Sequence, residues 1–189
     1  IDLHPFKIIL LNTKVSHNLA TSEYNVRKAE CEEGVSVIQK KYPEVKSLRD
    51  VDKEMLANVK AEMREIVFRR CSFIIAENTR VLQMAKALES NNLKEVGALL
   101  YEAHEGISTG YEVSCKESDF LVDFSKANPQ VLGARQTGGG FGGCTLNIVA
   151  ENAVEGFVLD AATAYKKAFD IDLEWFEVSP SSGTKATWL

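Results

Sequence analysis

Half of the glycines in this sequence lie in one short segment, and that segment is the best candidate for chemistry. Six of the 12 glycines fall between residues 133 and 143. Glycine reaches positive φ freely and has no Cβ to keep backbone N–H groups away from a ligand. Consecutive N–H groups that curl around a concavity form a nest suited to phosphate. The segment therefore predicts an anion-binding loop. The alternatives are a mobile linker or a tight loop between strands that binds nothing.

The segment does not fit three better-known glycine loops. Gly138, Gly140 and Gly143 satisfy the pattern G-x-G-x-x-G, but the dinucleotide-binding form of that pattern opens a helix. Residues 144–149 instead alternate in polarity, which predicts a strand. A Walker A loop requires Lys-Ser or Lys-Thr after the glycines, and neither pair follows here. Too few residues remain after Gly143 to supply the catalytic elements of a protein kinase.

The composition is that of one soluble globular domain, and it limits the possible functions. The 189 residues are 45% hydrophobic and 26% charged, with a net charge of −5. A negative balance argues against nucleic acid as the partner, because that affinity depends on cationic groups. No apolar run approaches the ~20 residues of a membrane span. The four cysteines form no CxxC pair and imply neither a zinc site nor a disulfide framework, so we expect a cytoplasmic protein.

Periodic apolar positions predict the elements that must hold the glycine segment. Ser114 and Glu117 form an S-x-x-E pattern, which predicts a capping box at the start of a helix. Because strands are expected near the two ends of the chain, we predict an α+β architecture with helices packed on one face of the sheet. Three or four strands are expected, of which 6–11, 144–149 and 173–178 are located, and the expected helices are 22–40, 52–59, 62–90, 93–107, 114–124 and 153–169.

Three motifs together resemble one enzyme family, the GHMP small-molecule kinases, in the form that galactokinases use. Residues 137–144, T-G-G-G-F-G-G-C, resemble the third motif of that family. Residues 22–32 resemble its S-E-Y-x-x-R-x-x-x-C-E segment. Residues 103–115 resemble its S-H-x-S-L-R-D-D-Y-E-V-S-C segment, although residues 107–110 read I-S-T-G in place of L-R-D-D. The motifs follow the family's order and cover nearly the whole chain.

The resemblance implies that residues 1–189 are the C-terminal half of a galactokinase. That half is a GHMP kinase C-terminal domain, a ferredoxin-like sheet with several helices packed on it. The family's galactose signature, its loop for the ATP phosphates, and its catalytic Asp with an Arg partner lie in the N-terminal half. No catalytic residue and no metal ligand are therefore expected in this chain. Because the chain opens on Ile1 rather than Met, we expect it to be processed, truncated or cut.

The reaction implied by the resemblance is transfer of the γ-phosphoryl group of ATP to the anomeric hydroxyl of α-D-galactose. ATP and Mg²⁺ are expected to be bound mainly by the N-terminal half, and this chain would close the sugar and phosphate side of the cleft. The implied partners are galactose, ATP and the N-terminal half of the same protein, with neither nucleic acid nor a membrane. Three alternatives stay open: an N-acetylgalactosamine kinase, a non-catalytic galactokinase-like sensor of sugar and ATP, and a purely structural module.

The resemblance also assigns roles to particular residues. It implies that the phenol of Tyr24 hydrogen-bonds a galactose hydroxyl. Helical spacing alone would instead place Tyr24 at the edge of the core, in line with Cys31 and Val35. The glycine loop is expected to line the cleft near the transferred phosphate, and its residues are Thr137, Gly138, Gly139, Gly140, Phe141, Gly142 and Gly143.

Three other polar residues have a structural and a functional interpretation. His104 has the chemistry of a general base, but a single histidine on a helix is expected to be a hydrogen-bonded structural residue. Arg27 and Arg135 can offset phosphate charge. For Arg27 we favour an ion pair with Glu23, four residues earlier, that holds the helix carrying Tyr24.

Overall fold

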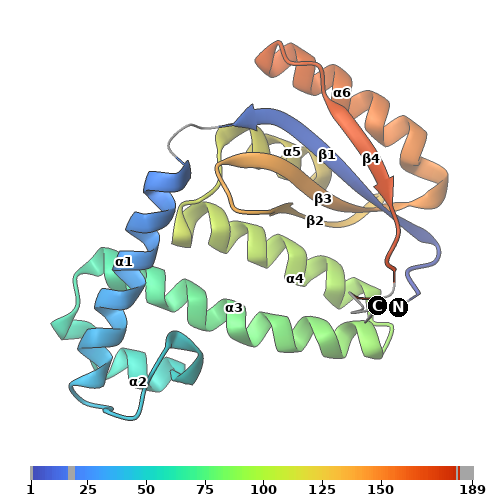
Figure 1. Cartoon of the computed structure of the whole chain (residues 1–189). Coiled ribbons are helices and arrows are strands. Elements are labelled where there is room, and N and C mark those ends of the chain that lie inside the picture. The colour runs from blue at the N-terminus through green and yellow to red at the C-terminus, as the bar shows by residue number, and fades with distance from the viewer. Residues whose placement is uncertain (1, 17–19, 182, 184–189) are drawn as a thin grey trace, which may run out of the picture.

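The computed structural model describes residues 2–16, 20–181 and 183, and all structural statements concern those residues. Each helix and strand predicted above has a counterpart among them (Figure 1). The elements in chain order are β1 (Phe6–Ser16), α1 (Ala20–Gln39), η1 (Leu48–Asp50), α2 (Lys53–Ala57), η2 (Lys60–Glu62), α3 (Glu65–Glu89), α4 (Leu93–Glu105), the π-helical turn η3 (Gly106–Tyr111), α5 (Lys116–Lys126), β2 (Val131–Thr137), β3 (Gly142–Ala150), η4 (Glu151–Ala153), α6 (Val154–Phe169) and β4 (Glu174–Val178).

The four strands form one antiparallel sheet in the order β2-β3-β1-β4. β1 comes first in the chain, yet it lies between β3 and β4, so the two ends of the described chain meet in the sheet. Together with the helical segments between β1 and β2 and between β3 and β4, this is the β-α-β-β-α-β arrangement of a ferredoxin-like fold. The predicted α+β class and ferredoxin-like sheet are therefore confirmed.

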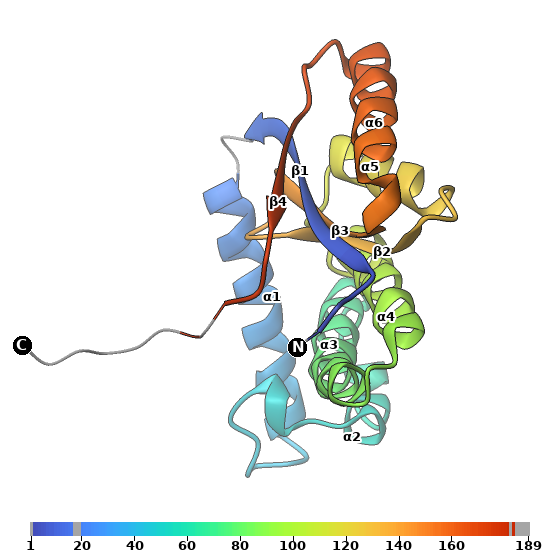
Figure 2. The same ribbon diagram turned by 90° about the vertical axis from the view of Figure 1, so that its right-hand side faces the viewer.

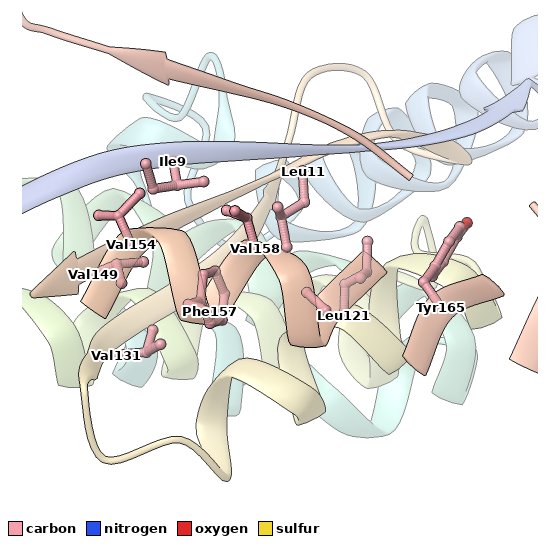
Figure 3. Packing of buried hydrophobic residues seen from close by; sticks show 10 residues of the cluster. Ile9, Leu11, Leu121, Val131, Val149, Val154, Phe157, Val158 and Tyr165 are labelled. Atoms are coloured by element: carbon pink, nitrogen blue, oxygen red, sulfur yellow. The ribbon is translucent and has the colours of Figure 1, made fainter. Parts of the chain in front are cut away.

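Helices cover both faces of this sheet, so the expectation of one covered face is wrong. On one face, Ile9 of β1 and Val149 of β3 pack with Leu121 of α5 and Phe157 of α6 (Figure 3). On the other face, Ile148 packs with buried residues of α4 and of the end of α3. Successive side chains of a strand point to opposite faces. Because β3 is apolar at consecutive positions, it needs a helix on each side.

α1, α2 and most of α3 build a second core away from the sheet. α1 and α3 extend beyond the sheet, with α2 at their far end (Figures 1 and 2). Their buried residues form a separate cluster that includes Ile38, Val67 and Cys71. The stripe of apolar residues predicted over 62–90 therefore faces α1 and α2 in part and α4 in part. Within the described residues, no helix is long and apolar enough to cross a membrane.

The start of α5 differs from the prediction. The N-cap position is Cys115, which makes no side-chain capping bond, so the predicted capping box is wrong. The Ser114 hydroxyl instead contacts Asp119 Oδ1 (2.6 Å) and Gln136 Oε1 (3.1 Å). These contacts, with a carboxylate in the first turn of α5 and an amide from β2, take the place of a capping bond to the backbone of the helix. Ser114 therefore links α5 to the strand that leads into the glycine loop.

Candidate functional site

A cavity of about 300 Å³ lies where α1, α3, η3 and the glycine loop meet. It is at the small end of the range for ligand pockets in proteins and has room for a single sugar ring. Aromatic and charged side chains line it together with the backbone of two glycines. The lining residues are Tyr24, Arg27, Phe73, Glu77, Ile107, Tyr111, Val113, Arg135, Gln136, Gly138, Gly139 and Phe141.

Tyr24 lies at this cavity and not in the core. It sits near the start of α1, and 62% of its surface is exposed. Tyr111 also lines this cavity and stacks on Phe73, with ring centroids 4.9 Å apart. The exposure of Tyr24 shows that its ring is not buried in the core, although Tyr24 borders one surface pocket together with Cys31 and Val35, as the helical spacing predicts. Its contact with a sugar stays a prediction, and a phenol in this position has the chemistry to donate a hydrogen bond to a bound hydroxyl.

The glycine loop has a defined shape that glycine is needed to form. Gly138 and Gly140 have φ of +93° and +95°, and Gly142 has φ of +122°. A residue with Cβ rarely adopts these angles. The loop is also held from outside, because the Phe141 N–H donates to the Val113 carbonyl at 2.7 Å. A loop fixed at both ends by β2 and β3 and tied at its centre is not a mobile linker.

Only part of the predicted loop lines the cavity. A Cβ added to Gly138 or Gly139 would have nothing within 4 Å, so these two positions present open backbone to a ligand. Thr137 pairs with Cys144 in the β2–β3 ladder. Gly140, Gly142 and Gly143 are not among the residues that line the cavity. Their approach to a phosphate stays a prediction, as does that of Thr137.

A cluster of charged side chains borders the cavity, and Arg135 and Glu77 of this cluster line it. Arg135 Nη1 lies 3.8 Å from Glu77 Oε2, and Arg80 pairs with the same carboxylate. Burial, and to a lesser degree the charge of Arg80, lowers the pKa of Arg135 from its ordinary value. An arginine nevertheless stays protonated in a protein. Arg80 also lies 3.7 Å from Glu102 Oε2, so the two arginines are matched by two carboxylates, and Arg135 is the one of these two arginines that lines the cavity.

His104 is a buried structural residue, as predicted. Its Nδ1 accepts a hydrogen bond from the Gln136 N–H (3.1 Å), and its Nε2 lies 3.1 Å from Asp119 Oδ1. Burial raises the pKa of Asp119, but hydrogen bonds from His104, Ser114 and Ser108 outweigh that effect and hold the pKa below its ordinary value. Through the bond from the Gln136 N–H to its Nδ1, His104 is placed to fix the end of β2, one residue before the glycine loop begins.

Arg27 and η3 contribute more to the site than the sequence indicated. Arg27 makes the predicted ion pair with Glu23, with Nη1 and Oε2 3.4 Å apart. It also donates to the carbonyls of Tyr111 (2.8 Å) and Glu112 (3.0 Å), which no local pattern could indicate because those residues are more than 80 positions away. Tyr111 and Phe73 were not singled out from the sequence. The one signal that could have identified Tyr111 is its position within the matching motif over residues 103–115.

The described residues hold no group of three or more His, Cys, Asp or Glu side chains that could bind a metal ion. All four cysteines lie within the described part of the chain and are free thiols.

Comparisons with known proteins agree with this architecture. Residues 84–167 match the family model described as GHMP kinases C terminal. A galactokinase of Thermotoga petrophila is 37% identical over 183 residues, which are 97% of this chain and 50% of that protein. The crystal structure of Lactococcus lactis galactokinase complexed with galactose has a TM-score of 0.88 and 30% identity over 94% of this chain and 46% of that one. L. major mevalonate kinase, at 17% identity and a TM-score of 0.54, shares the fold alone.

The fold is thus that of a GHMP kinase C-terminal domain. More particularly, the chain is similar to galactokinases over nearly its whole length, which confirms the resemblance that the three motifs predicted. The chain spans about half the length of the curated relatives it matches.

Proposed function

We propose that this chain is the C-terminal half of a galactokinase that transfers the γ-phosphoryl group of ATP to the anomeric hydroxyl of α-D-galactose. In this proposal the other half binds most of the ATP and Mg²⁺ and supplies the catalytic Asp and Arg. The present chain closes the sugar side of the cleft. Galactose and ATP are its small-molecule ligands, the other half of the protein is its partner, and the cytoplasm is its compartment.

The cavity supports this proposal most directly. It brings the Tyr24 phenol, the open backbone of Gly138 and Gly139, and the Arg135 guanidinium around one volume of sugar size. Phosphoryl transfer depends mainly on positioning the acceptor and stabilising charge on the phosphoryl oxygens. A phenol suits a sugar hydroxyl, whereas backbone N–H groups and a guanidinium suit a phosphoryl group. The similarity to a galactokinase whose structure contains galactose adds to this support.

The test is a coupled ADP-release assay on the full-length protein with MgATP and a panel of sugars. We expect turnover with galactose and much lower kcat/KM with glucose. A higher kcat/KM for N-acetylgalactosamine than for galactose would show that N-acetylgalactosamine, and not galactose, is the preferred substrate. Binding of galactose and ATP without ADP release would indicate that the protein is a sensor and not an enzyme.

The 189-residue chain alone is expected not to phosphorylate galactose. Loss of a catalytic constellation removes several orders of magnitude in rate. The same assay on the purified chain checks this, with the full-length protein at equal concentration as the control. Robust turnover by the chain alone would show that it holds a complete catalytic set and would overturn the division of labour proposed here.

A further inference from the structure

Arg70 is a charged residue deep in the protein for which the proposed reaction provides no role. It lies on α3 and is only 2% exposed. Its guanidinium donates to Glu30 Oε2 (3.1 Å), to the Gly110 carbonyl (2.6 Å) and to Glu112 Oε2 (2.5 Å). A buried cation needs such partners to offset the loss of water. These acceptors come from α1 and from the end of η3, so one side chain joins three elements.

A second guanidinium holds the same turn from α1. Arg27 Nε and Nη2 donate to the carbonyls of Tyr111 and Glu112. Its Nη1 lies 3.7 Å from the Glu30 carboxylate that Arg70 also contacts. Three consecutive carbonyls, from residue 110 to residue 112, thus accept hydrogen bonds from buried arginines.

The backbone that these arginines hold is in an unfavourable conformation. Glu112 has φ of +55° and ψ of +51°, in the left-handed region where a residue with Cβ is disfavoured. Such a conformation persists where the surrounding contacts over-determine it. The carbonyl bonds from Arg27 and the paired Glu112 carboxylate provide that constraint.

This turn is connected directly to two walls of the cavity. Tyr111, inside the turn, is a lining residue. The next carbonyl after the turn, that of Val113, accepts from the Phe141 N–H (2.7 Å) and from Gln136 Nε2 (3.1 Å), so it holds the glycine loop. Tyr24 lies one helical turn before Arg27 on α1. The arginine network therefore connects α1, which carries Tyr24, to the turn that contains Tyr111 and holds the glycine loop.

We propose that Arg70 is a positioning residue for the galactose cavity: it fixes the turn over residues 110–113 and thereby holds Tyr111 and the glycine loop at their distance from Tyr24. This inference rests on the proposed function. Arg70 does not line the cavity, so it acts through the turn and not on the ligand. Lysine cannot replace it, because one ammonium on a flexible stem does not reproduce the fixed fork of a guanidinium.

The test compares Arg70→Lys with Arg69→Lys in the full-length protein. Arg69 is the matched control because it pairs with the other oxygen of the same Glu112 carboxylate (2.6 Å) from a half-exposed position, with no bond to the turn's carbonyls. One readout is the pair of KM values for galactose and ATP. The other is hydrogen exchange in a peptide that contains Phe141, with a peptide from α6 as the reference for global stability.

For Arg70→Lys we expect the galactose KM to rise by about tenfold to a hundredfold, because a displacement of ~1 Å at a site costs that much. The ATP KM should change less than twofold. The Phe141 peptide should exchange at least tenfold faster while the α6 peptide is unchanged. Arg69→Lys should alter no value more than about twofold. Glu112→Gln, which keeps the shape of the side chain and weakens the same contact, should raise the galactose KM severalfold.

Three results would overturn the proposal. Equal galactose KM values in Arg70→Lys and Arg69→Lys would remove Arg70 from the positioning of the cavity. Equal acceleration of exchange in the Phe141 and α6 peptides would make it a general stabilising residue. If Arg70→Lys does not fold, an unchanged galactose KM in Glu112→Gln would have the same meaning. Failure of the wild-type protein to phosphorylate galactose would instead contradict the proposed function, while the exchange experiment would still decide whether Arg70 holds the loop.

Discussion

The glycine loop has two parts that differ in what surrounds them. Gly138 and Gly139 border the cavity, and a Cβ on either would meet nothing within 4 Å. At Gly140 and Gly142 a Cβ would lie 2.7 and 2.2 Å from main-chain carbonyl oxygens. In the second part glycine is required by the protein's own packing, whereas the first part leaves backbone accessible to a ligand. The glycines of one short loop therefore serve two physical purposes, and substitution can separate them.

The largest effect is expected for Gly142→Ala, in the packed part of the loop. The new methyl group would lie 2.2 Å from the Val15 carbonyl at a φ of +122°. Backbone strain and overpacking together should cost roughly 3 kcal/mol of stability or more. Urea unfolding measures this. Gly156→Ala is the control, since its Cβ would meet nothing within 4 Å in the helix α6, and it should be neutral or stabilising by up to about 1 kcal/mol. Equal stability of the two variants would contradict the packed interpretation.

Gly139→Ala should have the opposite profile. Gly139 has neither a positive φ nor a neighbour within 4 Å, so stability should change by less than about 0.5 kcal/mol. If a substrate approaches the backbone there, the methyl group should lower kcat/KM of the full-length enzyme about tenfold or more, which corresponds to about 1.4 kcal/mol. Steady-state kinetics and thermal unfolding on the same preparation check both values. Wild-type kinetics would mean that the open part of the loop contacts no ligand.

Tyr24→Phe tests the tyrosine that lines the same cavity as this open part of the loop. The ring stays and only the hydroxyl is lost, so the expected cost is roughly 0.5–1.5 kcal/mol for a neutral hydrogen bond. The loss should appear in the galactose KM, with the ATP KM and the melting temperature nearly unchanged because the side chain is exposed. Tyr101→Phe is the control. Its hydroxyl is buried on α4 without a partner among the described residues and does not line the cavity. An unchanged galactose KM in Tyr24→Phe would remove that residue from the site.

The elements and the surface of the site could be predicted from the sequence because they depend on local patterns. The apolar stripe over residues 62–90 appears as α3, and alternation over 144–149 appears as β3. The exposed Tyr24 and the glycine loop were found from motifs in which residue type and spacing carry the signal. These features lie within stretches of a few turns or one hairpin, where backbone geometry alone relates the residues.

The supports of the site could not be predicted, because they join residues far apart in the chain. Arg70 and Glu112 are 42 positions apart, and nothing near either residue indicates the other. The left-handed conformation of Glu112 is equally invisible, since a glutamate rarely adopts it without external constraint. The capping-box prediction at Ser114 failed for the same reason, because Gln136 on a distant strand competes for the hydroxyl. Long-range contacts thus decide which local tendency prevails.

The smallest expected effect concerns the stabilising charge of the Glu112 carboxylate at low pH. The hydrogen bond from Arg70, assisted by the charges of Arg70, Arg69 and Arg27, lowers the pKa of Glu112 from its ordinary value of 4.5. A carboxylate with a lowered folded-state pKa contributes stability that is fully present above its unfolded-state pKa. That contribution disappears as the pH falls through the folded-state pKa.

Glu112→Gln should therefore be less stable than the wild type at pH 7, and the difference should stay constant down to about pH 5. As the pH falls further, through the lowered folded-state pKa of Glu112, the two unfolding curves should converge, because the wild-type carboxylate becomes protonated. Glu102→Gln is the control, since Glu102 is mostly exposed and lies 3.7 Å from its arginine partner. Urea unfolding across this range measures the effect. A difference between wild type and Glu112→Gln that grows as the pH falls has the opposite sign and would show that the carboxylate does not stabilise the turn in its charged form.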